Sequence, residues 1–182
     1  MTDPDPDGQP ESAILVPVPE AEPAVGHLRA RLDRSAGQGV PAHVTVLYPF
    51  MPPTQITAAV LSGVAAAVAT VPAFDCRFAR TAWFGDNVVW LAPEPDGPFR
   101  ALTAAVHAAF PEYPPFGGQH AEVIPHLTVG DGSAGGLAAL RAAEAEVRSA
   151  LPVRTGVGSA WLMTGTRAPG SWRRLAVLPL GS

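Results

Sequence analysis

The chain has 182 residues, of which 47% are hydrophobic and 15% are charged, with 21 Pro and 18 Gly. This balance predicts a turn-rich globular fold with a hydrophobic core and excludes a disordered chain. The net charge of −4 argues against an extended basic surface for nucleic acid, so an RNA-like substrate should be short or bound by a local patch.

Cysteine content and the composition of the N-terminus bear on location. Cys76 is the single cysteine, which excludes an intrachain disulfide and a cysteine metal site and is typical of a reducing compartment. Residues 1–11 are acidic and Pro-rich and lack the cationic and apolar parts of a secretory signal. Residues 56–71 are rich in Ala and Val but are interrupted by polar residues, which favours a buried helix over a membrane span. We therefore expect a cytoplasmic protein.

The first half of the chain predicts strands and helices in alternation. Residues 13–18 form an apolar run that ends in prolines, as a strand at a sheet edge can. Residues 22–34 have apolar side chains at helical spacing, and residues 42–48 alternate as a second strand does. A second helix is expected over residues 54–70, with Thr54 as its N-cap.

The second half predicts a hairpin, a helix, a strand, a further helix and a closing strand pair. These elements are expected in chain order at residues 74–80 and 88–91, 98–110, 125–129, 137–151, and 159–163 with 173–178.

The two halves have a similar order of elements, and no segment between them has the composition of a flexible linker. We predict an α+β fold with two internally related lobes. Residues 1–12 are expected to form a disordered tail, and residues 13–182 a single bilobal domain.

A repeated motif carries the chemistry. The sequence reads HVTV from His43 and HLTV from His126, 83 positions further on, each in a predicted strand. Side chains alternate across a strand, so His43 and Thr45 share one face, as do His126 and Thr128. If the two strands lie side by side or are related by pseudo-symmetry, the four side chains converge on one cleft.

Such a cleft is equipped for phosphoryl transfer. A neutral imidazole can take a proton from attacking water while a protonated one gives a proton to the departing oxygen, because the usual pKa of histidine lies near neutrality. The two Thr hydroxyls can donate hydrogen bonds to the phosphate oxygens. The alternative is structural, with two partly buried histidines that neighbouring hydroxyls satisfy. A metal site is less favoured because neither motif contains Asp or Glu.

Four aromatic residues are candidates for contact with a substrate base. Tyr48 follows the first motif, Trp83 and Phe84 lie at the tip of the predicted hairpin, and Phe116 lies in the long loop before the second motif. Packing in the core or in a lid is the competing interpretation for each of them.

The segments HVTVLYPF at residues 43–50 and PHLTVG at residues 125–130 resemble the paired motifs of the 2H phosphoesterase superfamily, in particular its 2′-5′ RNA ligase branch. The ending at residues 159–181 is similar to the closing strand pair of that branch. The resemblance implies two pseudo-symmetric lobes, with antiparallel sheets lining a central cleft and helices outside. It also implies hydrolysis of 2′,3′-cyclic or 2′-5′ phosphodiester bonds without a metal or cofactor, with His43 and His126 as acid and base and Thr45 and Thr128 as phosphate ligands.

These observations predict a phosphodiesterase acting on a small nucleotide or an RNA end, in a monomeric protein with no membrane partner and no extended nucleic-acid surface. Two alternatives stay open. One is RNA end joining by the reverse reaction, and the other is a non-catalytic nucleotide sensor that uses the same cleft.

Overall fold

A computed structural model describes residues 8–119 and 122–182. Within them, eight strands form two antiparallel four-stranded sheets, in the orders β2-β1-β7-β8 and β5-β4-β3-β6. The first sheet contains β1 (Glu11–Pro17), β2 (His43–Leu47), β7 (Ser159–Gly165) and β8 (Arg173–Pro179). The second contains β3 (Phe74–Phe84), β4 (Val88–Glu94), β5 (Leu127–Asp131) and β6 (Val153–Val157).

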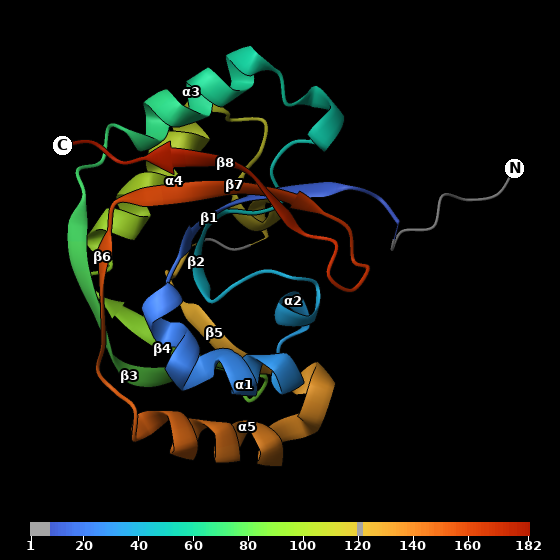
Figure 1. Cartoon of the computed structure of the whole chain (residues 1–182), viewed down its shortest axis with the longest axis vertical. Helices are drawn as coiled ribbons and strands as arrows, with labels where there is room; N and C mark the ends of the chain where they lie inside the picture. Colours follow the sequence, from blue (N-terminus) through green and yellow to red (C-terminus); the bar gives the residue numbers. More distant parts are fainter. Residues whose placement is uncertain (1–7, 120–121) are drawn as a thin grey trace, which may run out of the picture.

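Neither lobe is a contiguous half of the chain (Figure 1). The chain returns to the first sheet with β7 and β8 after it has completed the second. The helices are also exchanged between the lobes. Helix α1 (Glu22–Leu32) packs on β5 and on α5 (Gly132–Arg148), whereas α4 (Gly97–Ala109) packs on β2 and on α3 (Ala58–Val68).

The predicted fold class is confirmed: two antiparallel sheets with helices outside them, in an α+β fold. Most predicted elements are present, and the structure adds one strand and one short α-helix. Strand β6 was not predicted, because it has only five residues and contains Gly156. A short helix, α2 (Arg34–Gly37), follows α1 and was not predicted. None of the described helices is long and apolar enough to span a bilayer.

Several element boundaries also differ from the prediction. Helix α3 begins after Thr57, whose hydroxyl accepts from the Val60 N–H at 3.3 Å, so Thr54 is not its N-cap. The predicted cap lies instead in a 3₁₀ turn at Pro53–Gln55. Strand β1 begins at Glu11, inside the segment expected to be a tail, and residues 1–7 of that segment lie outside the described residues.

A buried apolar cluster runs through both lobes and joins the two sheets. In β2, Val44 and Val46 are buried, and in β5, Leu127 and Val129 are buried. These four residues alternate with the polar members of the repeated motif. Their burial therefore directs the polar members away from the core.

Gly130 allows α1 to approach β5 closely. A Cβ at Gly130 would lie 2.7 Å from the Leu32 Cβ and 3.3 Å from the Leu32 carbonyl oxygen. We predict that Gly130→Ala lowers the free energy of unfolding by about 1 to 3 kcal/mol, because the end of α1 must shift to admit the methyl group. Urea unfolding at neutral pH measures this change.

Gly156→Ala is the matched control, since it adds the same methyl group to β6 of the same sheet. Its nearest neighbour would be the Asp75 Oδ1 at 3.5 Å, which is an ordinary contact. The free energy of unfolding should change by less than about 0.5 kcal/mol. Equal losses in the two variants would contradict the crowding explanation.

Candidate active site

The two His-x-Thr motifs meet at the junction of the lobes. Strands β2 and β5 are edge strands of their sheets and contact each other. His43 and Thr45 lie in β2, Thr128 lies in β5, and His126 is the residue immediately before β5. All four side chains line one cleft of about 870 Å³. The structure therefore brings together residues that are 83 positions apart in the sequence.

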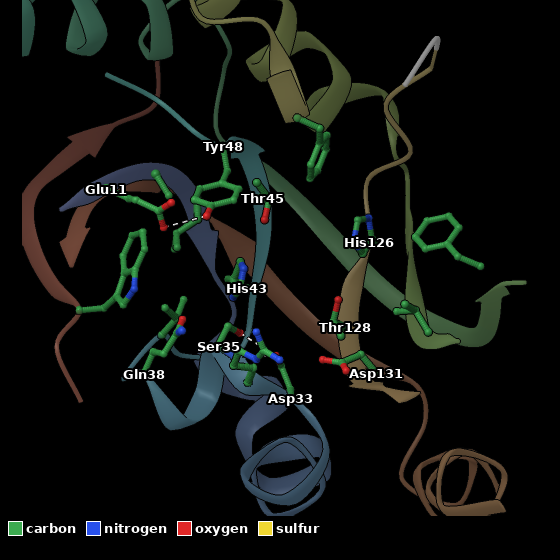
Figure 2. A pocket seen from close by; sticks show the side chains of 18 of the residues that line it. Glu11, Asp33, Ser35, Gln38, His43, Thr45, Tyr48, His126, Thr128 and Asp131 are labelled. Atoms are coloured by element: carbon green, nitrogen blue, oxygen red, sulfur yellow. Dashed lines mark hydrogen bonds between the residues drawn. The ribbon is translucent and has the colours of Figure 1, made fainter. Parts of the chain in front are cut away.

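Figure 2 shows the two motifs running in opposite directions on either side of the cleft. Thr45 lies on one side of His43 in the view, and Thr128 lies on the opposite side of His126. This diagonal arrangement is that of a local twofold axis between the motifs. A group bound between them can therefore meet an imidazole and a hydroxyl from each lobe.

Both imidazoles are oriented by the same backbone contact. The Nδ1 atom of His43 lies 2.7 Å from the carbonyl oxygen of Pro41, and that of His126 lies 2.7 Å from the carbonyl oxygen of Ile124. A carbonyl oxygen only accepts, so each Nδ1 carries a hydrogen and donates it. The other ring nitrogen, Nε2, is then the atom that exchanges a proton with a ligand.

The environment of His43 strongly disfavours its charged form. Burial is the largest cause, and with the positive charge of Arg29 it lowers the pKa of His43 from 6.5 to about 4. The hydrogen bond to Pro41 and the charge of Asp33 oppose this shift, while His126 adds slightly to it. Both rings line the same cleft, so a charge on one disfavours a charge on the other.

Burial also lowers the pKa of His126, and the hydrogen bond to Ile124 partly offsets it. The ring lies edge-on to two aromatic side chains, with centroid distances of 4.9 Å to Phe84 and 5.8 Å to Trp90. No arginine contributes to the shift of His126. The two histidines thus have the same backbone anchor but different electrostatic surroundings.

The aromatic candidates differ in their position. Tyr48 and Phe116 line the cleft, and the Phe116 N–H donates to the Tyr48 carbonyl oxygen at 2.7 Å. Trp83 is not among the described residues that line the cleft, and the guanidinium of Arg141 lies 4.3 Å from its ring centroid. Phe84 lines the cleft in its place, because neighbouring residues of a strand point to opposite faces.

Tyr48 forms one wall of the cleft and is held by Glu11. Its hydroxyl donates to the Glu11 Oε2 at 2.9 Å (Figure 2). Burial and this contact raise the pKa of Tyr48 to about 12, so it is a neutral donor at physiological pH. Trp172 lies beside it, with ring centroids 6.4 Å apart.

Two cationic residues of the cleft were not predicted as site residues. Arg34 belongs to α2, and Arg167 lies in the loop between β7 and β8. Gln38 connects the two segments, because its side-chain amide donates to the Arg167 carbonyl oxygen at 3.3 Å. Neither segment has a motif or a periodic pattern, so no sequence signal could have placed them beside the histidines.

Two carboxylates of the cleft lining, those of Asp33 and Asp131, already have partners. Asp33 pairs with Arg29 at 2.9 Å, and Asp131 accepts from the backbone N–H of Ser133 at 2.9 Å as the N-cap of α5. Within residues 8–119 and 122–182, no group of three or more His, Cys, Asp or Glu side chains is arranged to hold a metal ion.

Comparison with known proteins adds a family and a set of similar folds. The family described as the 2′-5′ RNA ligase superfamily matches residues 17–169. No curated protein is similar enough in sequence to count as a relative. Solved structures with the same fold include E. coli LigT complexed with 3′-AMP, at 17% identity and a TM-score of 0.57, covering 98% of this chain and 100% of that one. TT0787 of Thermus thermophilus has 19% identity and a TM-score of 0.60, with 94% and 99% covered.

The low pKa of His43 predicts a loss of stability in acid. Its folded pKa of about 4 lies below the ordinary 6.5, so the unfolded chain takes up a proton first as the pH falls. The free energy of unfolding should therefore drop by about 2 kcal/mol between about pH 7 and pH 4.5 on account of this group. His43→Asn should remove this part, because an amide can keep the bond to Pro41 but does not titrate.

Urea unfolding across the pH range measures the effect. In the double variant His43→Asn/His126→Asn, the free energy of unfolding should depend even less on pH, because the pKa of His126 is lowered as well. A His43→Asn protein with the wild-type pH dependence would contradict this account of the buried imidazole.

Proposed function

We propose, on the premise that this chain belongs to the 2′-5′ RNA ligase superfamily of 2H phosphoesterases, that it hydrolyses 2′,3′-cyclic or 2′-5′ phosphodiester bonds in nucleotides or RNA ends. The family match covers 17–169 and confirms the predicted resemblance. The observation that carries the proposal is the convergence of both His-x-Thr motifs on one cleft.

The donor and acceptor groups of the cleft match the needs of the reaction. Each imidazole presents Nε2 to the cleft, since Nδ1 is bonded to a carbonyl oxygen. Thr45 and Thr128 supply hydroxyls that can donate to the non-bridging oxygens of a phosphate between the motifs. One histidine would accept the proton of the attacking water, and the other would protonate the departing ribose oxygen.

The reaction requires one charged and one neutral imidazole. Burial lowers the pKa of both rings, so the empty cleft favours two neutral histidines near pH 7. An anionic phosphate raises the proton affinity of groups beside it. Binding of substrate would therefore bring a proton into the site and prepare the acid.

We propose that the mechanism needs no metal, because two hydroxyls and a protonated imidazole can stabilise the phosphate charge and the neighbouring carboxylates have other partners. Asp33 is paired with Arg29, and Asp131 caps α5.

The charge of the cleft favours a small substrate. Its lining holds four carboxylates, those of Glu11, Asp33, Glu122 and Asp131, and two arginines, Arg34 and Arg167. This is too little positive charge to bind a run of phosphates, and it suits a mononucleotide or an RNA end. The structure of E. coli LigT complexed with 3′-AMP supports a ligand of that size. A cytoplasmic location and a monomeric state stay predictions.

We predict that His43→Ala and His126→Ala each lose more than about a thousandfold in kcat/KM on a panel of 2′,3′-cyclic and 2′-5′-linked nucleotides in EDTA. Thr45→Val and Thr128→Val should each lose roughly a hundredfold, because each removes one donor to the phosphate. His27→Ala is the matched control, since His27 is an exposed partner of Glu146 outside the cleft and its loss should leave the rate unchanged.

Each outcome separates the candidate functions. Activity that survives loss of either cleft histidine, or that disappears with chelator, would contradict the proposed mechanism. Nucleotide binding without turnover, measured by calorimetry, would favour the sensor. Joined products from RNA halves, with no hydrolysis, would favour end joining.

A further inference from the structure

The first sheet carries a second apolar cluster on its cleft face, apart from the main core. Five residues of this cluster also line the cleft, namely Ala13, Leu15, Val40, Tyr48 and Trp172. All of them except Tyr48 are at most 7% exposed, so their side chains form a closely packed surface. A planar apolar group bound in the cleft could rest on this surface.

The apolar surface begins at the first motif and ends at a carboxylate. Leu15 of β1 pairs with Thr45 of β2, and paired residues of neighbouring strands point to the same face. Ala13 and Glu11 follow Leu15 at intervals of two residues, and all three line the cleft. The rise of a strand places the Cα of Glu11 about 13 Å from that of Leu15. Ala13 and Leu15 thus form an apolar floor between the motif hydroxyl and the Glu11 carboxylate.

Two aromatic rings flank Glu11 at the end of the apolar floor. Glu11 pairs with Gly165 of β7, and a Cβ at Gly165 would lie 2.5 Å from the Trp172 Cγ. The indole of Trp172 therefore packs directly on the sheet beside Glu11. Tyr48 lies on the other side, because its hydroxyl donates to the Glu11 Oε2 at 2.9 Å and its ring centroid is 6.4 Å from that of Trp172. In Figure 2, Glu11 and Tyr48 lie on the side of Thr45 that is away from the second motif.

Glu11 differs from the other carboxylates of the cleft lining in its partners. Asp33 pairs with Arg29 at 2.9 Å, and Glu122 pairs with Arg100 at 3.1 Å. Asp131 accepts from a backbone N–H at 2.9 Å.

Within the described part of the chain, the Glu11 carboxylate accepts only from the Tyr48 hydroxyl and forms no ion pair. An ionised carboxylate has about four acceptor positions, so Glu11 can accept two further N–H groups side by side.

The free acceptor positions of Glu11 match guanine better than the other bases. The Watson–Crick edge of guanine presents two adjacent donors, N1–H and the amino group, which fit the two oxygens of a carboxylate. Adenine and cytosine place a ring acceptor beside their amino group, and the N–H of uracil lies between two carbonyl oxygens. These acceptors would face the carboxylate without a hydrogen between them, which costs binding free energy.

We propose that this part of the cleft is a guanine subsite, in which the base lies on the floor of Ala13 and Leu15 and donates from N1–H and its amino group to Glu11. Tyr48 holds the carboxylate in place for these contacts. The inference deepens the proposed function and rests on it, since the phosphate would lie at the motifs. The substrate is then guanosine 2′,3′-cyclic phosphate or an RNA end whose last base is guanine. Glu11 determines specificity and takes no part in the proton transfers.

The base preference is tested by measuring kcat/KM on the 2′,3′-cyclic phosphates of guanosine, inosine, adenosine, cytidine and uridine. Guanosine should be favoured about tenfold over inosine, which lacks only the amino group. It should be favoured about a hundredfold over adenosine, cytidine and uridine, because each of them sets an acceptor against the carboxylate.

Glu11→Gln tests the residue itself, because the amide keeps the size of the side chain and an oxygen for the Tyr48 hydroxyl but removes one acceptor for the base. The ratio of kcat/KM for guanosine to that for adenosine should fall from about a hundredfold to less than about threefold, mainly through a loss on guanosine. Glu122→Gln is the matched control, since it removes the same charge from a cleft carboxylate that pairs with Arg100. It should leave the ratio unchanged.

The results separate this inference from the proposed function. If wild-type protein turns over all five nucleotides with similar kcat/KM, the guanine subsite is overturned and the function stands. If Glu11→Gln keeps the preference, or loses activity equally on every base, the role of Glu11 is overturned.

If wild-type protein turns over none of the nucleotides, the proposed function fails, and calorimetry with 3′-GMP and 3′-AMP tests the subsite alone. Tighter binding of 3′-GMP that disappears in Glu11→Gln supports the subsite. Equal affinity for the two nucleotides, or no binding of either, overturns it.

Discussion

Two edge strands, one from each sheet, meet at the cleft, and burial of their apolar residues fixes the direction of their polar ones. Val44, Val46, Leu127 and Val129 are each at most 1% exposed. A slip of either strand by one residue would expose these side chains and bury an imidazole and a hydroxyl in their place. The packing of the core therefore also fixes the geometry of the site.

The exchange of helices explains how two lobes hold this geometry. Helix α1 leaves the first sheet and packs on β5 of the second, and α4 leaves the second sheet and packs on β2 of the first. Each motif strand thus packs against a helix that follows a strand of the other sheet in the chain. If one lobe moved relative to the other, both motif strands would lose apolar contacts with these helices.

The electrostatics of the site follow from this packing. The helix that covers β5 also carries Arg29, whose guanidinium donates to the Val40 carbonyl oxygen in the segment before β2. Beside His126 of the second motif lie aromatic side chains from β3 and β4, those of Phe84 and Trp90. A fold with nearly repeated motifs can in this way give its two imidazoles different electrostatic surroundings.

The sequence by itself determined the class of the fold, most of its elements and the four motif residues, because strand alternation and helical spacing are local properties of the chain. It did not determine that β7 and β8 return to the first sheet or that α1 crosses to the second, since long-range pairing depends on packing between distant segments. Only the tertiary structure decided that Arg34, Gln38 and Arg167 line the cleft, that Phe84 lines it and Trp83 does not, and that Arg29 contacts the segment before His43. None of them belongs to a local pattern, and each acts through a neighbour that the chain reaches only on folding.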